Sequence, residues 1–477
     1  VFAGGVCTVN PEPLADFIDL CILGEGEEVN GEVIALYDKA KHEGWDKPRF
    51  LRQASHIPGV YVPALYKFSW SGDGTISAIE ALDGAPAVVT KRIVSDLDRA
   101  AFPTSPIVPS TEIVHDRASL ELFRGCSRGC RFCQAGICYR PARERTEENL
   151  RKMARGLVDA TGYDEMSLTS LSSADYSCLG RLVDDLMADF RDEKVSFSLP
   201  SLRIDSFSID LAHKMQQVRK SGLTFAPEAG TQRLRDVINK NVTWDEIEKT
   251  CTIAFNAGYT SVKLYFMMGL PTETMEDIEG IAETAQKVVD LYYKNTNHAK
   301  GRGVQVTISC ACFVPKPHTP FQFVPMDTAE TLQAKQKHLL ESVHSRKIKV
   351  NYHDSTTSFL EGVFAKGDRR LAPVIVEAYK RGCYFDGWEE CFKYDTWMQT
   401  FADLGIDPAF YCQRPIALDE VTPWSHMDYG ITHEYLVREY NKALAAQTTP
   451  PCNRACNACG ANHLLGGPCF DYSQNLV

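Results

Sequence analysis

Short apolar runs alternate with amphipathic stretches between residues 118 and 325, and this alternation is the main pattern of the chain. Short continuous apolar runs predict buried strands, whereas apolar residues spaced three and four apart predict helices. The candidate strands are Leu120–Phe123, Met166–Leu171, Val195–Leu199, Leu223–Phe225, Val262–Met267 and Val304–Phe313. Thr243 and Glu246 have the spacing of a capping box, so a helix is expected to begin there. Six such units are too few for a closed eight-stranded barrel and predict an α/β fold with a partial (β/α)6, TIM-like barrel.

The first residues predict a separate α/β segment. Val1–Gly5 has the pattern of a strand that runs into a glycine turn, and Ile18–Leu23 predicts a second strand followed by a glycine-bearing loop. This order is typical of the end of a doubly wound α/β domain. The sequence is therefore expected to begin within a domain, whose tail occupies residues 1–35.

Two further regions flank the predicted barrel. Residues 36–117 form a connector, in which Tyr66–Trp70 and Thr75–Ile79 predict a β-hairpin around a glycine-bearing turn. Residues 118–325 are the predicted core. Residues 326–477 are mostly helical in pattern and predict an accessory domain that ends in a cysteine-rich segment.

Composition narrows the functional classes. The chain has 477 residues, 44% of them hydrophobic, and a formal net charge of -11, which argues against a surface that is basic throughout. It contains no apolar run long enough to cross a membrane. Its 17 cysteines are clustered in a large chain without a signal peptide, a pattern typical of metal binding in a reducing compartment. We therefore expect a cytoplasmic protein.

Three cysteines follow the first candidate strand in a loop rich in glycine and arginine: Cys126, Cys130 and Cys133. Three thiolates do not complete a four-coordinate structural zinc site. They can instead hold three irons of a cubane cluster and leave the fourth iron open. A zinc site completed by a distant histidine or cysteine, or three unrelated thiols, are the alternatives.

This spacing, with Phe132 directly before the last cysteine, resembles the signature of the radical S-adenosylmethionine (SAM) enzymes. The resemblance implies a [4Fe-4S] cluster on Cys126, Cys130 and Cys133, with SAM bound to the open iron. It implies reductive cleavage of SAM to a 5'-deoxyadenosyl radical, driven by an electron donor such as flavodoxin or ferredoxin. Phe132 would then pack near the adenine.

In such barrels, functional residues follow the carboxyl ends of the strands. The resemblance places Ser172 and Ser173 where the family often has a Gly-Gly-Glu motif that meets the SAM amino group. It implies that Arg203 meets the SAM carboxylate, although capping of a strand end is an equal alternative. Gly269 lies in a turn that resembles the glycine-rich segment of the family near adenine.

Glu228 follows the fourth candidate strand and precedes a short glycine-bearing turn. A carboxylate there can accept hydrogen bonds from the ribose hydroxyls of SAM. The alternative is a structural salt bridge to Arg233 or Arg235. His318, after the sixth strand, is a weak candidate for an acid or base, and a structural role is its alternative.

Three arginines follow the cysteine loop: Arg140, Arg143 and Arg145. They can screen an anionic cluster or meet a phosphate. A solvated, charged helix start is the equally weighted alternative.

A second group of cysteines lies near the end of the chain and comprises Cys452, Cys456 and Cys459, with His463 and Cys469 nearby. Four ligands can be drawn from this group. It predicts either a structural zinc ion or an auxiliary iron–sulfur cluster, and unbound thiols are the alternative.

The first 35 residues are similar to the closing segment of the cobalamin-binding domain found in one branch of the radical SAM family. That likeness implies an enzyme, with cobalamin-dependent methyl transfer to an unactivated carbon as one reaction. An RNA-modifying enzyme of the methylthiotransferase type is a second reading. A non-enzymatic zinc protein that binds RNA is a third. The sequence does not identify the substrate.

Overall fold

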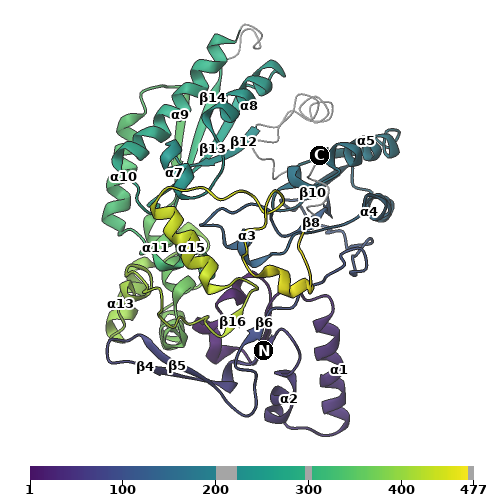
Figure 1. Cartoon of the computed structure of the whole chain (residues 1–477), viewed down its shortest axis with the longest axis vertical. Helices are drawn as coiled ribbons and strands as arrows, with labels where there is room; N and C mark the ends of the chain where they lie inside the picture. Colours follow the sequence, from purple (N-terminus) through teal and green to yellow (C-terminus); the bar gives the residue numbers. More distant parts are fainter. Residues whose placement is uncertain (200–222, 296–302, 471–477) are drawn as a thin grey trace.

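The computed structural model describes residues 1–199, 223–295 and 303–470 of the chain. Two parallel sheets with their helices carry the core, an N-terminal α/β unit lies at the opposite end, and C-terminal helices lie against the second sheet (Figure 1). The predicted mixed α/β fold with a partial barrel is confirmed.

The first parallel sheet has the order β11-β10-β7. Its strands are β7 (Ala118–Glu121), β10 (Glu165–Thr169) and β11 (Ser196–Ser198). Two helices accompany it, α4 (Glu147–Thr161) and α5 (Leu179–Asp189). The apolar face of α4 packs with buried strand residues such as Leu120 and Leu168, so these elements share one core.

The second parallel sheet has the order β12-β13-β14-β15. Its strands are β12 (Leu223–Glu228), β13 (Ser261–Met268), β14 (Gln305–Cys312) and β15 (Ile348–Tyr352). Its helices are α7 (Gln232–Val237), α8 (Trp244–Asn256), α9 (Met275–Lys294) and α10 (Ala329–Ser342). The predicted capping box at Thr243 begins α8 and is confirmed. All six predicted strands are confirmed, and β15 is a seventh that lies beyond the predicted core boundary at residue 325.

The N-terminal unit holds a small sheet of order β1-β2-β3. It comprises β1 (Phe2–Ala3), β2 (Leu20–Ile22), β3 (Val60–Tyr61), α1 (Val29–His42) and α2 (Lys47–Ala54). β1 and β2 are parallel, whereas β3 is antiparallel to β2. Because β3 belongs to this sheet, the unit reaches past the predicted boundary at residue 35.

The connector contains the predicted hairpin, β4 (Tyr66–Trp70) and β5 (Ile76–Ala81), which pair antiparallel. It is joined to the C-terminal region, because β6 (Val89–Thr90) pairs with β16 (Met427–Asp428). The short strands β8 (Phe123–Arg124) and β9 (Arg143–Glu144) pair with each other. They flank the first cysteine loop.

The C-terminal region is mainly helical, as expected. Its helices are α11 (Ser355–Lys366), α12 (Ala372–Lys380), α13 (Tyr394–Asp403), α14 (Ala409–Cys412) and α15 (His433–Leu444). The 3-10 helices of the chain include η1 (Val6–Val9), η2 (Glu12–Phe17), η3 (Pro63–Leu65), η4 (Ser173–Asp175), η6 (Pro320–Phe323), η7 (Arg369–Leu371), η8 (Glu389–Cys391) and η9 (Ala461–Leu465). Among the helices of the described residues, none has the length and apolar character needed to span a membrane.

Candidate functional site

The first cysteine loop runs from β8 into the short helix α3 (Gln134–Cys138). A side chain at Gly136 would lie 3.4 Å from Sγ of Cys133 and 4.0 Å from Cβ of Cys126. These two cysteines, which are seven positions apart in the sequence, therefore lie on the same side of α3. The loop turns at Gly125, whose φ of 86° is one that glycine adopts readily.

The thiols of this loop lie close enough to affect one another. The pKa of Cys126 is raised to about 11 and that of Cys133 to about 12, chiefly by burial and in part by the negative charge of Cys130. Arg140 lowers the pKa of Cys126, and Lys240 lowers that of Cys133. Metal ligation requires thiolates, so iron binding would release protons here.

The donor set fits a cluster rather than a single ion. Across the described ranges, no group of three or more His, Cys, Asp or Glu side chains is arranged to hold one metal ion. A zinc ion needs its ligands to converge on one point. In a cubane, each cysteine binds a different iron, so the ligands stand further apart. Three thiols on one short loop suit the cubane.

Arg131 fixes the cysteine loop to the rest of the protein. Its side chain is fully buried and pairs with Glu439 of α15 at 3.1 Å. The guanidinium also donates to the carbonyl oxygen of Val237 at 2.9 Å and to that of Gln447 at 2.7 Å. One side chain thus connects the loop, the end of α7 and the segment after α15.

Asn239 supports the same loop from the α7–α8 turn. Its amide donates to the carbonyl oxygen of Gly129 at 3.0 Å, and its oxygen accepts from the backbone of Thr449 at 2.8 Å. A side chain at Gly129 would meet Nδ2 of Asn239 at 2.8 Å, so glycine is required for this approach. This explains one glycine of the predicted glycine-rich loop.

Phe132 packs where the strands of the second sheet end. It contacts the apolar cluster that contains Ala229, Leu270 and Phe313, which follow β12, β13 and β14 respectively. The cysteine loop therefore lies over the carboxyl ends of these strands. This is the end of a barrel at which catalytic residues gather.

Glu228 and Lys240 form an ion pair beside the loop. Nζ of Lys240 lies 3.0 Å from Oε1 of Glu228, and the two side chains are 11% and 16% exposed. The predicted alternative partners, Arg233 and Arg235, are wrong: Arg233 pairs with Asp277, and Arg235 donates to backbone oxygens. The α7–α8 turn directs Lys240 back toward β12, which the helix pattern alone does not reveal.

Lys240 is a candidate that sequence reasoning missed. Its charge acts on both Glu228 and Cys133, so it lies between a strand end and the cysteine loop. The residues on either side, Asn239 and Asn241, have φ values of 52° and 53°. Asparagine tolerates this left-handed region better than most residues, so the Asn-Lys-Asn triplet was an available turn signal.

Ser172 and Ser173 are almost completely buried, and both hydroxyls have protein acceptors. Ser172 donates to Asp175 at 2.7 Å, and Ser173 donates to the carbonyl oxygen of Leu168 at 3.1 Å. Asp175 also accepts from Nε of Arg128 in the cysteine loop at 2.8 Å. Ser172 therefore supports the cysteine loop through Asp175, which binds both Ser172 and Arg128. A direct contact of the two serines with SAM stays a prediction.

Two other predicted SAM contacts have different outcomes. Arg203 lies outside the described residues. Gly269 has a φ of 87°, and its backbone donates to Glu273 at 2.7 Å. Glu273 is in turn paired with Lys335 at 2.7 Å. The turn at Gly269 is therefore held by a buried ion pair, and its contact with adenine stays a prediction.

His318 lies against the N-terminal unit. Nε2 is 2.9 Å from the carbonyl oxygen of Val9, and the ring centroid is 4.6 Å from that of Tyr429. Burial lowers the pKa of His318 to about 4, so the ring is neutral near pH 7. These contacts favour the structural alternative over an acid or base.

The three arginines after the loop are all buried, so a solvated helix start is wrong. Arg143 pairs with Glu25 at 2.7 Å, and Arg145 pairs with Glu121 at 3.2 Å. Arg140 donates to the hydroxyl of Tyr435 at 3.1 Å. A buried guanidinium loses its hydration, and hydrogen-bonding or charged partners such as these must compensate that loss. Arg140 alone also acts electrostatically on the cysteine loop.

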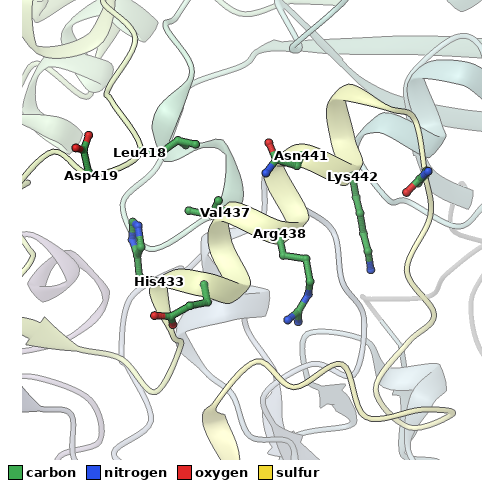
Figure 2. Close-up of a pocket in the computed structure, with 9 residues that line it drawn as sticks. Leu418, Asp419, His433, Val437, Arg438, Asn441 and Lys442 are labelled. Carbon is green, nitrogen blue, oxygen red and sulfur yellow. The ribbon is translucent and has the colours of Figure 1, made fainter.

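A surface hollow of about 740 Å³ lies beside α15 (Figure 2). Leu418 and Val437 contribute its apolar lining, and Figure 2 shows Arg438 and Lys442 extending from the same helix. The lining contains no cysteine and no residue that follows a core strand.

Comparison with known proteins agrees with this geometry. Residues 120–285 match the family model described as the radical SAM superfamily. The chain contains a radical SAM domain. Residues 1–63 match a second model, described as the N-terminal region of radical SAM proteins. The enzymes of that superfamily use a [4Fe-4S] cluster and SAM.

An uncharacterized protein of Methanocaldococcus jannaschii is 29% identical over 406 residues, which are 85% of this chain and 79% of that protein. Among solved structures, the cobalamin-dependent radical SAM enzyme OxsB is 12% identical, with a TM-score of 0.45, over 93% of this chain and 65% of that one. The radical SAM methyltransferase TsrM from Kitasatospora setae is 13% identical, with a TM-score of 0.40, over 65% of this chain and 56% of that one. The chain spans less than two thirds of the length of each of these two structures.

The hollow over the carboxyl ends of β1 and β2 is too small for a corrinoid. This hollow measures about 50 Å³ and is lined by Lys91, Cys138 and Tyr429, among others. Pockets for ligands of drug size measure roughly 300 Å³ or more. A side chain at Gly24 would meet the carbonyl oxygen of Arg92 at 2.1 Å, so the loop is already closely packed. These residues alone do not form a cobalamin site.

Proposed function

We propose that Cys126, Cys130 and Cys133 bind the [4Fe-4S] cluster and that SAM is cleaved beside them. The observation that supports this most is the place of the cysteine loop, which packs through Phe132 onto the carboxyl ends of β12, β13 and β14. When bound, the cluster supplies the electron that cleaves SAM to methionine and the 5'-deoxyadenosyl radical. The remaining roles belong to residues of the chain.

Lys240 and Glu228 are suited to SAM itself. The Lys240 ammonium can donate to the SAM carboxylate, and the Glu228 carboxylate can accept from the ribose hydroxyls. Each already balances the charge of the other at 3.0 Å, so neither is buried without a partner. The apolar cluster around Phe313 and Phe321 would exclude water from the reacting end of SAM.

The test is anaerobic reconstitution followed by dithionite and SAM, with 5'-deoxyadenosine measured by mass spectrometry. We expect the product from the unmodified chain and none from Cys130→Ala. Cys391→Ala, which changes a cysteine of η8, is the matched control and should retain the product. A colourless protein with stoichiometric zinc at the first loop, or no product from a reduced, reconstituted protein, would favour the non-enzymatic alternative.

Methyl transfer stays a prediction. The resemblance that suggested it rests on the N-terminal segment, and the described residues there do not hold a corrinoid. We therefore assign no step to cobalamin. SAM carrying an isotopically labelled methyl group distinguishes the reactions, because methyl transfer moves the label to the substrate, whereas hydrogen abstraction alone leaves it in methionine.

RNA is a second candidate substrate, supported by an exposed aromatic patch between α12 and α13. The exposed fractions of its rings are 67% for Tyr379, 52% for Tyr384, 71% for Phe385 and 64% for Trp388. Lys393 lies 5.8 Å from the ring centroid of Tyr384. Rings beside cations can stack on unpaired bases. The net charge of -11 opposes RNA binding elsewhere, so binding would depend on this patch.

A fluorescent single-stranded RNA of mixed sequence tests this candidate. Trp388→Ala should weaken binding by roughly tenfold, since stacking of one base is worth about 1–3 kcal/mol. Tyr352→Ala removes a ring that is 46% exposed at the edge of the second sheet and should leave affinity unchanged. Equal affinity of both variants, or no binding at low salt, would remove RNA as a candidate.

A further inference from the structure

For the C-terminal cysteine group, a bound metal stays a prediction. In the part of the chain that the structure describes, no three His, Cys, Asp or Glu side chains are arranged around one ion. His463 lies 2.6 Å from the carbonyl oxygen of Gly460 through Nδ1 and 3.2 Å from Oδ2 of Asp428 through Nε2, so both ring nitrogens have partners. A different place in the fold offers the donors of an ion site.

This place is a small hollow where the β4–β5 hairpin meets the C-terminal region (Figure 1). The hollow measures about 20 Å³ and is lined by residues of the hairpin turn, α11, η7, α14 and the segment after α14. A volume of roughly 10–15 Å³ is enough for one water molecule. The hollow therefore has room for one water molecule or one monatomic ion.

Lys366 lines this hollow and is a buried cation without an ion pair. It is the last residue of α11 and is 3% exposed. Among the described residues, its ammonium donates only to the carbonyl oxygen of Val324, at 3.4 Å, and lies beside no carboxylate at ion-pair distance. That contact is longer than the usual N–H···O distance of about 2.7–3.2 Å. Because an ammonium has three N–H donors, two of them are left for another partner.

The buried ammonium of Lys366 needs such a partner. Burial lowers its pKa to about 8, which leaves most of the lysine protonated at pH 7. A charge that is removed from water is strongly disfavoured unless a group of opposite charge or several hydrogen bonds compensate it. One long contact to a neutral carbonyl oxygen provides little of this compensation.

The two carboxylates that line the hollow are already paired with arginines. Oδ2 of Asp368 lies 2.6 Å from Nη2 of Arg370, and Oε1 of Glu420 lies 2.5 Å from Nη2 of Arg414. Each pair is joined by further hydrogen bonds. The lining thus contains three cations and two carboxylates, and the positive charge that remains is that of Lys366.

Arg414 contributes a second unused donor to the lining. Its Nε is buried and, within the described residues, has no hydrogen-bond partner, because the two Nη atoms bind the carboxylate of Glu420. The guanidinium lies 4.4 Å from the ring centroid of Phe410, which holds it in place. Two cations with unused N–H groups therefore line the same hollow.

The hydroxyl groups of the lining do not fill this need. The hydroxyl of Thr75 donates to Asp73 at 2.7 Å, and the hydroxyl of Thr422 is 2.9 Å from that of Ser425. The missing partner must therefore come from outside the chain. It must carry negative charge, accept N–H donors and be no larger than a monatomic ion.

We propose that this hollow binds one chloride ion, held by Nζ of Lys366 and Nε of Arg414. The size of the hollow, the unpaired charge of Lys366 and the two unused donors support it. A phosphate group is too large for this volume. The proposal does not depend on the proposed function of the cysteine loop.

A chloride ion here would stabilise the junction between the connector and the C-terminal region. Arg370 already donates to the carbonyl oxygen of Gly74 in the hairpin turn at 2.9 Å, and Ile76 pairs with Val421 in an isolated antiparallel bridge. The hollow exists only when these segments are assembled. Chloride should therefore bind the folded chain and not the unfolded chain, and so raise its stability.

Thermal unfolding of the full chain at pH 7 tests this effect. Sodium chloride replaces sodium gluconate stepwise at constant ionic strength, so that only the anion changes. We expect the unfolding midpoint to rise by roughly 1–4 °C and then to level off, as binding to one site in the folded state requires. An equal midpoint in both salts would overturn the proposal.

Lys366→Met tests whether the ion is bound at this hollow. The variant keeps the length of the side chain and removes its charge, so the midpoint should no longer depend on chloride. Lys152→Met, which changes an exposed lysine of α4, is the matched control and should keep the dependence of the unmodified chain. A chloride dependence that Lys366→Met retains would place the ion elsewhere and overturn the proposal.

Bromide locates the ion without relying on a variant. Crystals of the unmodified chain grown with sodium bromide should show an anomalous diffraction peak at the bromine absorption edge, within hydrogen-bonding distance of Nζ of Lys366. A water molecule in the hollow and no anomalous peak would overturn the proposal. A bromide peak in the absence of any chloride effect on unfolding would show binding at crystal concentration only, and would overturn it as well.

Discussion

Lys240 is the single side chain on which SAM affinity is expected to depend most. Lys240→Met removes an ammonium that lies 3.0 Å from Glu228 and acts on Cys133. A hydrogen bond to a charged group is worth about 1.5–3 kcal/mol, so SAM affinity should fall by roughly tenfold or more. Iron content should stay the same, since Lys240 is not a ligand. SAM affinity is measured by adding SAM stepwise and following the electron paramagnetic resonance spectrum of the reduced cluster.

Two variants make the Lys240 result specific. Lys240→Arg keeps the positive charge and should restore much of the affinity. Lys152→Met removes an exposed lysine of α4 and should change nothing. If Lys240→Met lowers iron content and SAM affinity together, Lys240 supports the loop and does not bind SAM.

His426 is buried among aromatic rings. Its ring centroid lies 5.1 Å from that of Tyr61 and 5.0 Å from that of Tyr66, and within the described residues neither ring nitrogen has a hydrogen-bond partner. Its pKa is lowered to about 3, chiefly by burial and in part by the nearby cation of Arg369. Glu12, whose Oε1 is 3.9 Å away, has a pKa that burial raises.

Protonation of His426 should destabilise the protein in acid. Between the ordinary histidine pKa of about 6.5 and the folded value of about 3, the unfolded chain binds a proton that the folded chain does not. The free energy of unfolding should therefore fall by about 1.4 kcal/mol per pH unit as the pH drops through this window. In His426→Phe, the free energy of unfolding at pH 7 should be unchanged. Its fall in acid should be smaller, because residue 426 no longer binds a proton in the unfolded chain. Urea unfolding at pH 7 and pH 5 measures the difference.

The matched control is His42→Phe, which changes a histidine whose side chain is 76% exposed. It should show the same acid sensitivity as the unmodified chain. Glu12 changes in the opposite direction, since its raised pKa favours proton uptake by the folded state, but it is present in both variants. An equal loss of stability in acid for both variants would contradict the prediction.

At the residue scale, the sequence predicted candidate ligands but not the contacts between distant residues. The spacing of Cys126, Cys130 and Cys133 is a local property, so it can be recognised in the sequence alone. Lys240 acts on Cys133 across a separation of 107 positions by subtraction, and only the fold brings them together. Ser172 and Ser173 were placed correctly after a strand, but the direction of their hydroxyls depends on Asp175 and Leu168.

At the scale of elements, the cysteine loop depends on a buried ion pair. Arg131→Met leaves Glu439, whose side chain is 1% exposed, without its guanidinium partner. Breaking such a buried pair costs about 3–5 kcal/mol. We expect a lower free energy of unfolding and less iron retained after gel filtration, because the same guanidinium connects the loop to α7 and α15. Chemical unfolding and iron analysis measure both.

Arg151→Met is the control for this element. Arg151 of α4 pairs with Asp185 and Asp189, but its side chain is 42% exposed. Surface pairs contribute about 0–1 kcal/mol. Iron retention should be unchanged in this variant. If Arg131→Met unfolds at the same denaturant concentration as Arg151→Met, the buried pair does not hold the loop.

The apolar pattern of the sequence predicted most strands of the two parallel sheets. Five of the six predicted strands have several buried residues, which gave each of them an apolar run in the sequence. β15 was missed because only Ile348 of Ile348–Tyr352 is buried. An edge strand needs no continuous apolar run, and its lysine and asparagine are typical of edges.

At the scale of the whole molecule, Glu25 connects the N-terminal unit to the predicted core. Glu25, directly after β2, accepts two hydrogen bonds from Arg143 of β9 at 2.7 and 2.9 Å. Its carboxylate also accepts from the backbone of Val94 at 2.6 Å. Because β9 pairs with β8, which leads into the cysteine loop, this contact connects the N-terminal unit to that loop.

Glu25→Gln should therefore separate the unfolding of this unit from that of the core. The variant leaves Arg143, which is 5% exposed, without a charged partner at 2.7 Å, at a cost of about 3–5 kcal/mol. We expect residues 1–63 to exchange backbone hydrogen faster than residues 118–199, measured by hydrogen–deuterium exchange and mass spectrometry. Glu28→Gln, which changes a carboxylate that is 53% exposed in its pair with Arg92, should leave both regions as in the unmodified chain. Uniformly faster exchange in both regions would instead show that the N-terminal unit and the core unfold as one cooperative body, in which Glu25 stabilises the whole molecule and not one interface.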